Sequence, residues 1–112
     1  DPSFSQLHKL ASERTKGDLA SLPAAPDPSS TARQTLNTGD AYFGYGEYAK
    51  AAEFYRAALA RPGADADLIN LHLGMALARQ GDKAGAAAAL KAVGASQSEL
   101  AKFWLLYVEA QA

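Results

Sequence analysis

The sequence predicts an all-α protein built from stacked pairs of helices, and two observations lead to this fold class. Alanine supplies much of the 48% apolar content of the 112 residues, and alanine is the best helix former and lets helices approach closely. The arrangement of small and large residues around Gly39 and Gly46 returns around Gly74 and Gly81. Gly74 follows Gly39 by 35 residues, and Gly81 follows Gly46 by the same distance. A period of this length is typical of a helical repeat protein.

Charge and composition exclude several classes of function. The 11 Lys and Arg residues nearly balance the 12 Asp and Glu residues, giving a net charge of −1, so no basic field is available to bind nucleic acid. The longest apolar run, residues 103–108, is far shorter than the roughly 20 residues that cross a bilayer. We therefore expect neither nucleic-acid binding nor membrane insertion.

The cellular compartment is left open by the sequence. The chain contains no cysteine, which removes disulfides and thiolate chemistry but is compatible with either side of a membrane. It begins without a methionine, and we expect a processed or shortened protein. Cytoplasm and the cell envelope both remain candidates, with the periplasm slightly favoured.

The first 30 residues form the first predicted region. Ser3-x-x-Gln6 is a capping-box pattern that indicates a short amphipathic helix. A brief turn is expected at residues 19–22, and three prolines in residues 23–30 predict an extended connector. We therefore divide the chain into residues 1–30, with one or more helices and the connector, and a helical domain of residues 31–112. The residues of the expected amphipathic face are Phe4, Leu7, Leu10 and Ala11.

The first repeat is expected at about residues 31–64. Asp27, Ser29 or Ser30 can cap a helix that runs to about Phe43. Gly44 and Gly46 make the turn, a second helix runs from Glu47 to about Arg61, and Pro62-Gly63 ends it. The apolar face predicted for the second helix consists of Tyr48, Ala51, Ala52, Tyr55, Ala58 and Leu59.

The second repeat is expected at about residues 65–95, followed by a capping helix at about residues 97–111. Asp65 or Asp67 caps a helix that stops at Gly81, and Asp82 caps the next helix, which runs to Val93. Ser96-x-x-Glu99 is a further capping box that opens the last helix.

A glycine in the middle of the first helix of each repeat predicts close contact between helices. Such a glycine costs about 1 kcal/mol against alanine, so its position usually needs the absent side chain. Gly39 and Gly74 are therefore predicted contact points, with Ala51, Ala58 and Ala86 as matching flat surfaces. The large residues expected to fill the space around them are Tyr42, Tyr55, Leu77 and Leu90.

The last helix carries more apolar residues than one buried face requires. Leu100, Phe103, Trp104 and Tyr107 form a stripe that should seal the end of the stack, while Leu105, Leu106 and Val108 point elsewhere. The latter three residues either contact the preceding helix or the N-terminal segment, or form a second interface such as a homodimer.

The sequence contains no complete motif for catalysis, cofactor binding or metal binding. Gly44-x-Gly46-x-x-Ala49 matches a dinucleotide fingerprint, but that motif needs a preceding strand, and here a helix is expected. His8 and His72 lie far apart, and no Gly-x-Ser-x-Gly elbow is present. We expect no catalytic residue, no cofactor and no metal site, and hence no enzyme.

The repeated pattern resembles the tetratricopeptide repeat (TPR), in the form of a small bacterial TPR domain. The first unit matches at Gly39-x-x-Tyr42-x-x-x-Gly46-x-Tyr48-x-x-Ala51-x-x-x-Tyr55-x-x-Ala58, and the second at Gly74, Leu77, Gly81, Ala86 and Leu90. Thr35 stands where the family often has tryptophan, and Pro62 lies one residue earlier than the usual closing proline. The resemblance implies an α-α superhelix with a C-terminal capping helix, in which the first helices line a concave groove for a peptide or helix of another protein.

Carried over by position, the resemblance also implies the residues of this groove. They are Arg33, Leu36, Asn37, Asp40, Phe43, Leu68, Leu71, His72, Met75 and Arg79. Leu36 and Asp40 occupy the positions where some family members clamp a terminal carboxylate with lysine and asparagine, so that clamp is not expected. The apolar residues with Arg33 and Arg79 suit an amphipathic or extended peptide with some acidic residues.

The function expected from this reading is a protein-interaction scaffold. Its main alternative is an assembly subunit that forms a homodimer through its terminal helices. A more distant alternative is an enzyme or small-molecule carrier with its pocket in the groove.

Overall fold

A computed structural model describes residues 19–94 and 97–111 of the chain. The described residues form α-helices and no strand, which confirms the all-α prediction. In chain order the helices are α2 (Ala32–Gly44), α3 (Tyr48–Leu59), α4 (Ala66–Gln80), α5 (Lys83–Lys91) and α6 (Ser98–Ala110). None of the described helices has the length and apolar character needed to cross a membrane.

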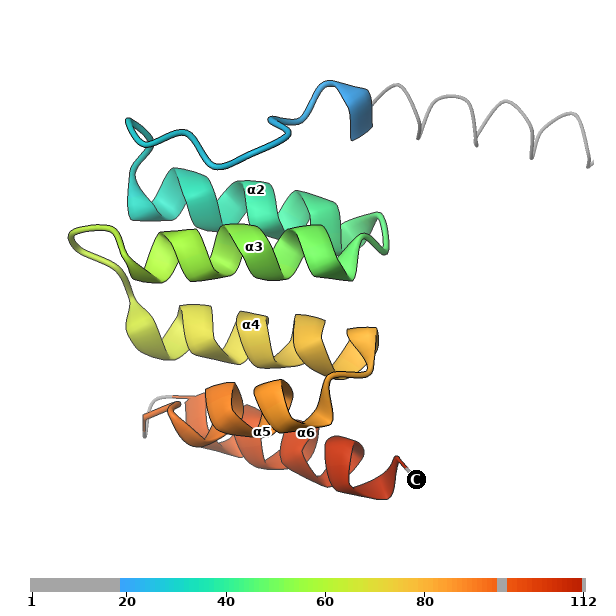
Figure 1. Cartoon of the computed structure of the whole chain (residues 1–112). Coiled ribbons are helices and arrows are strands. Elements are labelled where there is room, and N and C mark those ends of the chain that lie inside the picture. Colours follow the sequence, from blue (N-terminus) through green and yellow to red (C-terminus); the bar gives the residue numbers. More distant parts are fainter. Residues whose placement is uncertain (1–18, 95–96, 112) are drawn as a thin grey trace, which may run out of the picture.

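The helices lie in a row in which each one packs against the next (Figure 1). In addition, α4 contacts both α2 and α6, so the alternate helices also touch. The structure extends 52 × 39 × 21 Å and has a radius of gyration of 15.9 Å, where a compact domain of 100 residues has about 13 Å. The row is therefore flat and extended, with broad faces open to other molecules.

The start of α2 differs from the prediction. Thr31, not Asp27, Ser29 or Ser30, is the N-cap: its hydroxyl accepts from the Gln34 amide at 3.1 Å, and the Gln34 side chain accepts from the Thr31 amide at 2.9 Å. This reciprocal capping box satisfies two backbone donors at the helix end. Asp27 instead accepts from the amide and hydroxyl of Ser29, each at 2.9 Å, and so forms a turn before the helix.

Several of the other helix ends follow local signals in the sequence, although α3 and α6 begin without a side-chain cap. Asp65 caps α4 and Asp82 caps α5 through their side chains, as expected. Gly46 and Gly81 have φ values of 79° and 93°, which side chains disfavour, and each lies in a tight turn between paired helices. Helices α3 and α5 both end two residues before the predicted ends at Arg61 and Val93. The predicted cap Ser96 lies outside the described residues.

The 35-residue period of the sequence is also a period of the packing. A Cβ atom added to Gly39 would lie 2.7 Å from Cε1 of Tyr55, and one added to Gly74 would lie 2.5 Å from Cγ of Leu90. Both distances are too short for real contacts, so each glycine is a point of close approach between paired helices. Tyr55 and Leu90 are themselves 35 residues apart. The structure is therefore a helical repeat in three dimensions.

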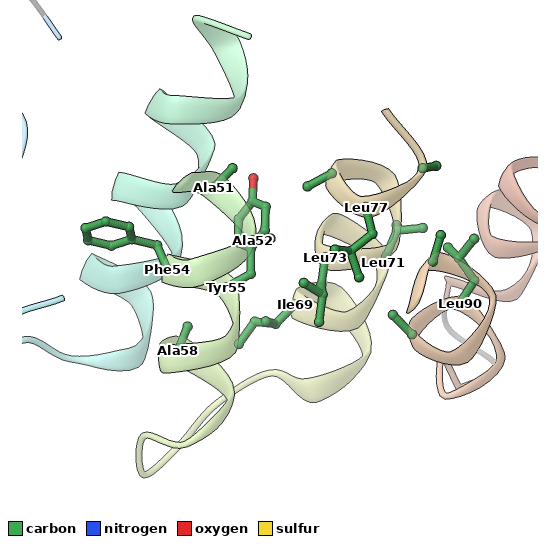
Figure 2. Packing of buried hydrophobic residues seen from close by; sticks show 14 of the residues in the cluster. Ala51, Ala52, Phe54, Tyr55, Ala58, Ile69, Leu71, Leu73, Leu77 and Leu90 are labelled. Atoms are coloured by element: carbon green, nitrogen blue, oxygen red, sulfur yellow. The ribbon is translucent and has the colours of Figure 1, made fainter. Parts of the chain in front are cut away.

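The core runs along the row of helices (Figure 2). Its largest fully buried side chains are Tyr55, Phe54, Ile69 and Leu90. Phe54 and Tyr55 leave α3 on different sides: Phe54 packs against Tyr42 of α2, with ring centroids 5.4 Å apart. Tyr55 lies between α3 and α4. Neighbouring residues on α3 thus connect successive layers of the stack.

The connector packs on the outer side of α2, away from α4 (Figure 1). The Tyr42 hydroxyl donates to the carbonyl of Pro23 at 2.7 Å, and the Arg61 guanidinium donates to the carbonyls of Asp27 and Pro28 at 2.9 and 2.7 Å. Leu19 and Leu22 pack against the core. The part of the N-terminal region from residue 19 onward is therefore docked on the helices, and the predicted helix with Phe4, Leu7, Leu10 and Ala11 lies outside the described residues.

The orientation of α6 is the main correction to the sequence analysis. Ala101 and Val108 are buried, and Trp104 and Leu105 are partly buried against the core. By contrast, Leu100, Phe103, Leu106 and Tyr107 are 52%, 63%, 66% and 37% exposed. The stripe expected to seal the stack therefore faces outward, except for Trp104. Of the two alternatives for the other three residues, packing within the stack holds for Leu105 and Val108, whereas Leu106 is exposed. Ala101 on the inward side of α6 is small, so the helix can approach its neighbours closely, which bulky aromatic residues at the contact would prevent.

Candidate functional site

A hollow of about 180 Å³ opens between α2, α3 and α4, and we call it the α2–α4 hollow. Four of the residues predicted for the groove line it, and two further residues join them. The lining residues are Asp40, Phe43, Gly44, Tyr55, His72 and Met75.

Helical spacing brings these side chains together. Asp40, Phe43 and Gly44 lie three and four residues apart near the end of α2, and His72 and Met75 lie three apart on α4, so each set shares one face. Tyr55 reaches the hollow from α3 because Gly39 has no side chain where the tyrosine ring passes. The absence of a side chain at Gly39 thus allows Tyr55 to line the hollow.

Asp40 is the polar centre of the hollow. Its Oδ1 atom accepts a hydrogen bond from the Tyr55 hydroxyl at 2.6 Å and lies 2.7 Å from Nδ1 of His72. An ionised carboxylate only accepts, so His72 carries its proton on Nδ1 in this contact and keeps Nε2 for another partner. The Tyr55 and His72 rings also meet edge to face, with centroids 5.7 Å apart. Three residues from three helices therefore fix one another.

The electrostatics of this cluster favour an ionised Asp40 and a neutral Tyr55. Partial burial by itself would raise the pKa of Asp40, but the hydrogen bonds from His72 and Tyr55 and the charges of His72 and Arg33 hold it below the usual 3.8. Burial, followed by the hydrogen bond to Asp40, raises the pKa of Tyr55 far above its usual value. Tyr55 is therefore a permanent donor to Asp40 at physiological pH.

An aromatic and cationic rim continues the surface from the hollow. Phe43 meets Tyr48 edge to face at a centroid distance of 5.2 Å. Arg79 lies over the Tyr48 ring at 5.4 Å and donates to its hydroxyl at 3.2 Å. This guanidinium is held in place by a cation–π contact while remaining exposed on the end of α4.

The other predicted groove residues do not all share this surface. Leu36 and Leu71, which the groove prediction includes, are only 3% exposed and belong to the core. Leu68 is partly buried against the core. Arg33 lines a second hollow of about 120 Å³ near the start of α2, and Asn37 is exposed but lines neither hollow. The second hollow is lined by Ala32, Arg33, Leu36, Gly63, Asp65 and Ile69.

Sequence reasoning placed Tyr55 among the structural repeat residues and missed its part in the site. The one signal for this role is the residue at the equivalent position of the second repeat. Leu90 stands there and fills the same space without a hydroxyl. The hydroxyl of Tyr55, at a position where the second repeat has an apolar leucine, is thus the sequence signal for the hollow beside the first repeat.

The hollow is suited to binding an apolar group beside a hydrogen-bonding one. Phe43, Tyr55 and Met75 form apolar walls, while His72 and Asp40 have 27% and 42% of their side chains exposed. The lining includes no serine, threonine or cysteine, and the hydroxyl of Tyr55 donates its hydrogen bond to Asp40. Across the described residues, no group of three or more His, Cys, Asp and Glu side chains gathers as a metal site would require.

Comparison of the chain with protein-family models, curated proteins and solved structures gave no match.

Proposed function

We propose that this chain is a TPR-like protein-interaction module that binds a peptide or helix of a partner protein across α2 and α4. One bulky apolar side chain of the partner would enter the α2–α4 hollow. The observation that carries the proposal is the hollow itself, which is apolar in its walls and held in shape by the bonds of Tyr55 and His72 to Asp40. A preformed site of this kind lowers the cost of ordering side chains on binding.

Two features support the TPR-like superhelix as the finer description of the fold. The glycine contacts at Gly39 and Gly74 and the positive-φ turns at Gly46 and Gly81 each recur after 35 residues. Helix α4 contacts both α2 and α6, which is the arrangement expected if these three are the first helices of successive repeats. A binding surface made by first helices follows from that arrangement.

The charges around the hollow favour a partner with acidic residues near its apolar anchor. Arg33 and Arg79 are both exposed, near opposite ends of the α2 and α4 surface. The negative charge of Asp40 is already engaged by His72 and Tyr55. Carboxylates of the partner can therefore pair with the two arginines, which gives the contact its specificity.

The same chemistry argues for a binding role without catalysis. A nucleophile or an acid–base pair would need a reactive group at the hollow. The hydroxyl present there, on Tyr55, stays protonated and bonded to Asp40. His72 in this setting offers Nε2 as a hydrogen-bond partner for the bound peptide.

A random-peptide display selection on the purified protein tests the proposal. We expect selected peptides to share one bulky apolar residue flanked by acidic residues. Met75→Glu should weaken their binding, since burial of one such side chain contributes about 1.5–3 kcal/mol, or roughly a 10- to 150-fold change in Kd. Ala88→Glu, which adds the same charge to an exposed site on α5, is the matched control and should leave Kd unchanged.

Two results would contradict the proposal. One is a selection that enriches no common motif. The other is a set of peptides that bind the Met75→Glu and Ala88→Glu variants equally well, because those peptides would occupy another surface.

A further inference from the structure

The outward side of α6 is an apolar surface at the end of the helix row. It consists of Leu100, Phe103, Leu106 and Tyr107, which we call the α6 patch. Their spacing of three, six and seven residues places them on one side of the helix. The opposite side of α6 packs against the core through Ala101 and Val108. Within residues 19–94 and 97–111, no other helix is packed over the patch, since the described contacts of α6 are with α4 and α5.

We propose that the α6 patch binds the α6 patch of a second copy of this chain, with the two helices antiparallel, to form a two-fold homodimer. The sequence of the patch supports this occupant. Leu100-x-x-Phe103-x-x-Leu106 reads the same in both directions about Phe103. A two-fold axis at Phe103 therefore places Leu100 beside the partner copy's Leu106 and brings the two Phe103 rings together. An isologous interface requires this kind of self-complementary patch.

The charges beside the patch favour the antiparallel orientation. Lys102 lies between Glu99 and Glu109 on α6, and it is 3.8 Å from Glu99 in its own helix. Two-fold antiparallel helices bring the same flank of each copy together. With the axis at Phe103, each Lys102 would lie between the Glu99 and Glu109 side chains of the other copy. A parallel pair would bring opposite flanks together and leave these carboxylates without that lysine.

The exposed area sets the strength expected of the dimer. The four side chains present roughly 400 Å² together, since a large side chain offers about 150–250 Å² when fully exposed. Two patches supply about 800 Å², whereas specific interfaces bury about 1,200–2,000 Å² in total. The patch is thus the apolar centre of an interface whose rim comes from Glu99, Lys102 and Trp104, and we expect a dimer that dissociates on dilution.

This dimer is independent of peptide binding at the α2–α4 hollow. The hollow is lined by residues of α2, α3 and α4, and α6 contributes none of them. A dimer would carry two such hollows, which could engage a partner with two binding segments at higher avidity. The tests of self-association use no peptide, so their failure would leave the proposed function untouched.

Sedimentation velocity of the full chain over a wide concentration range tests the dimer. We expect the wild type to shift from monomer to dimer as concentration rises. Phe103→Glu should weaken the dimer at least tenfold, and Ala88→Glu on α5 should leave it unchanged. A wild type that stays monomeric at millimolar concentration would overturn the proposal, as would a dimer that Phe103→Glu leaves intact.

Cysteine cross-linking gives a second test that does not depend on a folded Phe103→Glu variant. The chain contains no cysteine, so Leu100→Cys and Leu106→Cys can each carry the single thiol. A mixture of the two variants should form a disulfide-linked dimer under mild oxidation, whereas either variant alone should do so far less. Efficient cross-linking of Leu100→Cys to itself would refute the antiparallel arrangement.

Discussion

Gly39 and Tyr55 illustrate how one missing side chain shapes both the core and the candidate site. The tyrosine ring occupies the space where a Cβ of residue 39 would stand. The hydroxyl of the same ring then reaches Asp40, the next residue along α2. A change at Gly39 should therefore disturb stability and the hollow together.

We predict that Gly39→Ala lowers the free energy of unfolding by about 1 kcal/mol. Alanine gains about 1 kcal/mol of helix propensity, but overpacking against a buried ring costs about 1–3 kcal/mol. Gly44→Ala is the control, because a Cβ at Gly44 would have nothing within 4 Å. Urea denaturation should show the first variant less stable and the second equally or more stable than the wild type. Equal stabilisation of both variants would show that the Tyr55 ring can move away from a Cβ at residue 39 without loss of unfolding free energy.

A second prediction concerns Asp40 and pH. Its pKa is held below 3.8 in the folded state, so the ionised form stabilises the fold above the pKa of the unfolded chain. This contribution is lost as pH falls through the lower folded pKa. Because the side chain is 42% exposed, solvent screening limits the effect to about 1 kcal/mol.

Asp40→Asn tests this linkage. The wild type should exceed the variant in unfolding free energy at neutral pH, and the difference should shrink toward zero as the pH drops below the usual aspartate range. Asp67→Asn is not a suitable control, since that carboxylate accepts from the Gly94 amide at 2.9 Å. Asp27→Asn is unsuitable for the same reason, since Asp27 accepts from Ser29. Glu47→Gln is preferable, because Glu47 is exposed, lies outside the lining of the hollow and makes no capping hydrogen bond to α3. If the difference in unfolding free energy between the wild type and Asp40→Asn did not change with pH, the charge of Asp40 would not contribute to stability.

At the scale of helices, the sequence was informative where the signals are local. Asp65, Asp82 and Gly81 each act on the nearest backbone groups, so the ends they set could be predicted. The start of α2 was predicted wrongly because several capping residues stand in a row before it, although Thr31-x-x-Gln34 is a capping-box pattern that the sequence shows. The pairing of Thr31 with Gln34, three residues on, decided between them.

The facing of α6 depends on tertiary contact and was therefore predicted wrongly. Apolar residues surround most of this helix, so its pattern does not define one buried side. The contacts of α6 with α4 and α5 bury the side that carries Ala101 and Val108. The resemblance to the tetratricopeptide repeat implied that Asp40, Phe43, His72 and Met75 share one surface. It did not include the hydrogen bond from Tyr55 to Asp40, which forms only where α2, α3 and α4 meet.

The capping box at the start of α2 yields a prediction at this scale. Thr31→Ala should lower stability by about 1 kcal/mol, because it removes the acceptor for the Gln34 amide. Ser30→Ala tests the neighbouring residue that the sequence also offered as a cap, and it should change stability by much less. Thermal unfolding followed by circular dichroism can compare the two. A larger loss from Ser30→Ala would mean that α2 begins earlier in solution.

At the scale of the whole molecule, the two ends of the helix row differ in how far they are covered by other residues. The chain from residue 19 to the start of α2 lies along α2 and covers one end of the row (Figure 1). At the other end, the α6 patch is exposed among the residues that the structure describes. A stack of repeats needs both ends protected from water. The docked connector performs this task at one end, and a second copy would perform it at the other.

The last prediction concerns the hold of the connector on the row. Arg61 donates to two connector carbonyls, so Arg61→Ala should make residues 19–30 open more often while the helices stay folded. The exposed site limits the loss to about 1 kcal/mol, enough to change local opening about fivefold. Hydrogen exchange read by mass spectrometry should show faster exchange at the Leu22 and Ser30 amides, which donate to the carbonyls of Leu19 and Asp27, and unchanged exchange in α4. Arg56→Ala, at an exposed site on α3, should change neither. If Arg61→Ala accelerated exchange equally in α4, the connector would be part of one cooperative unit with the repeats, and its docking would then be a condition of the fold.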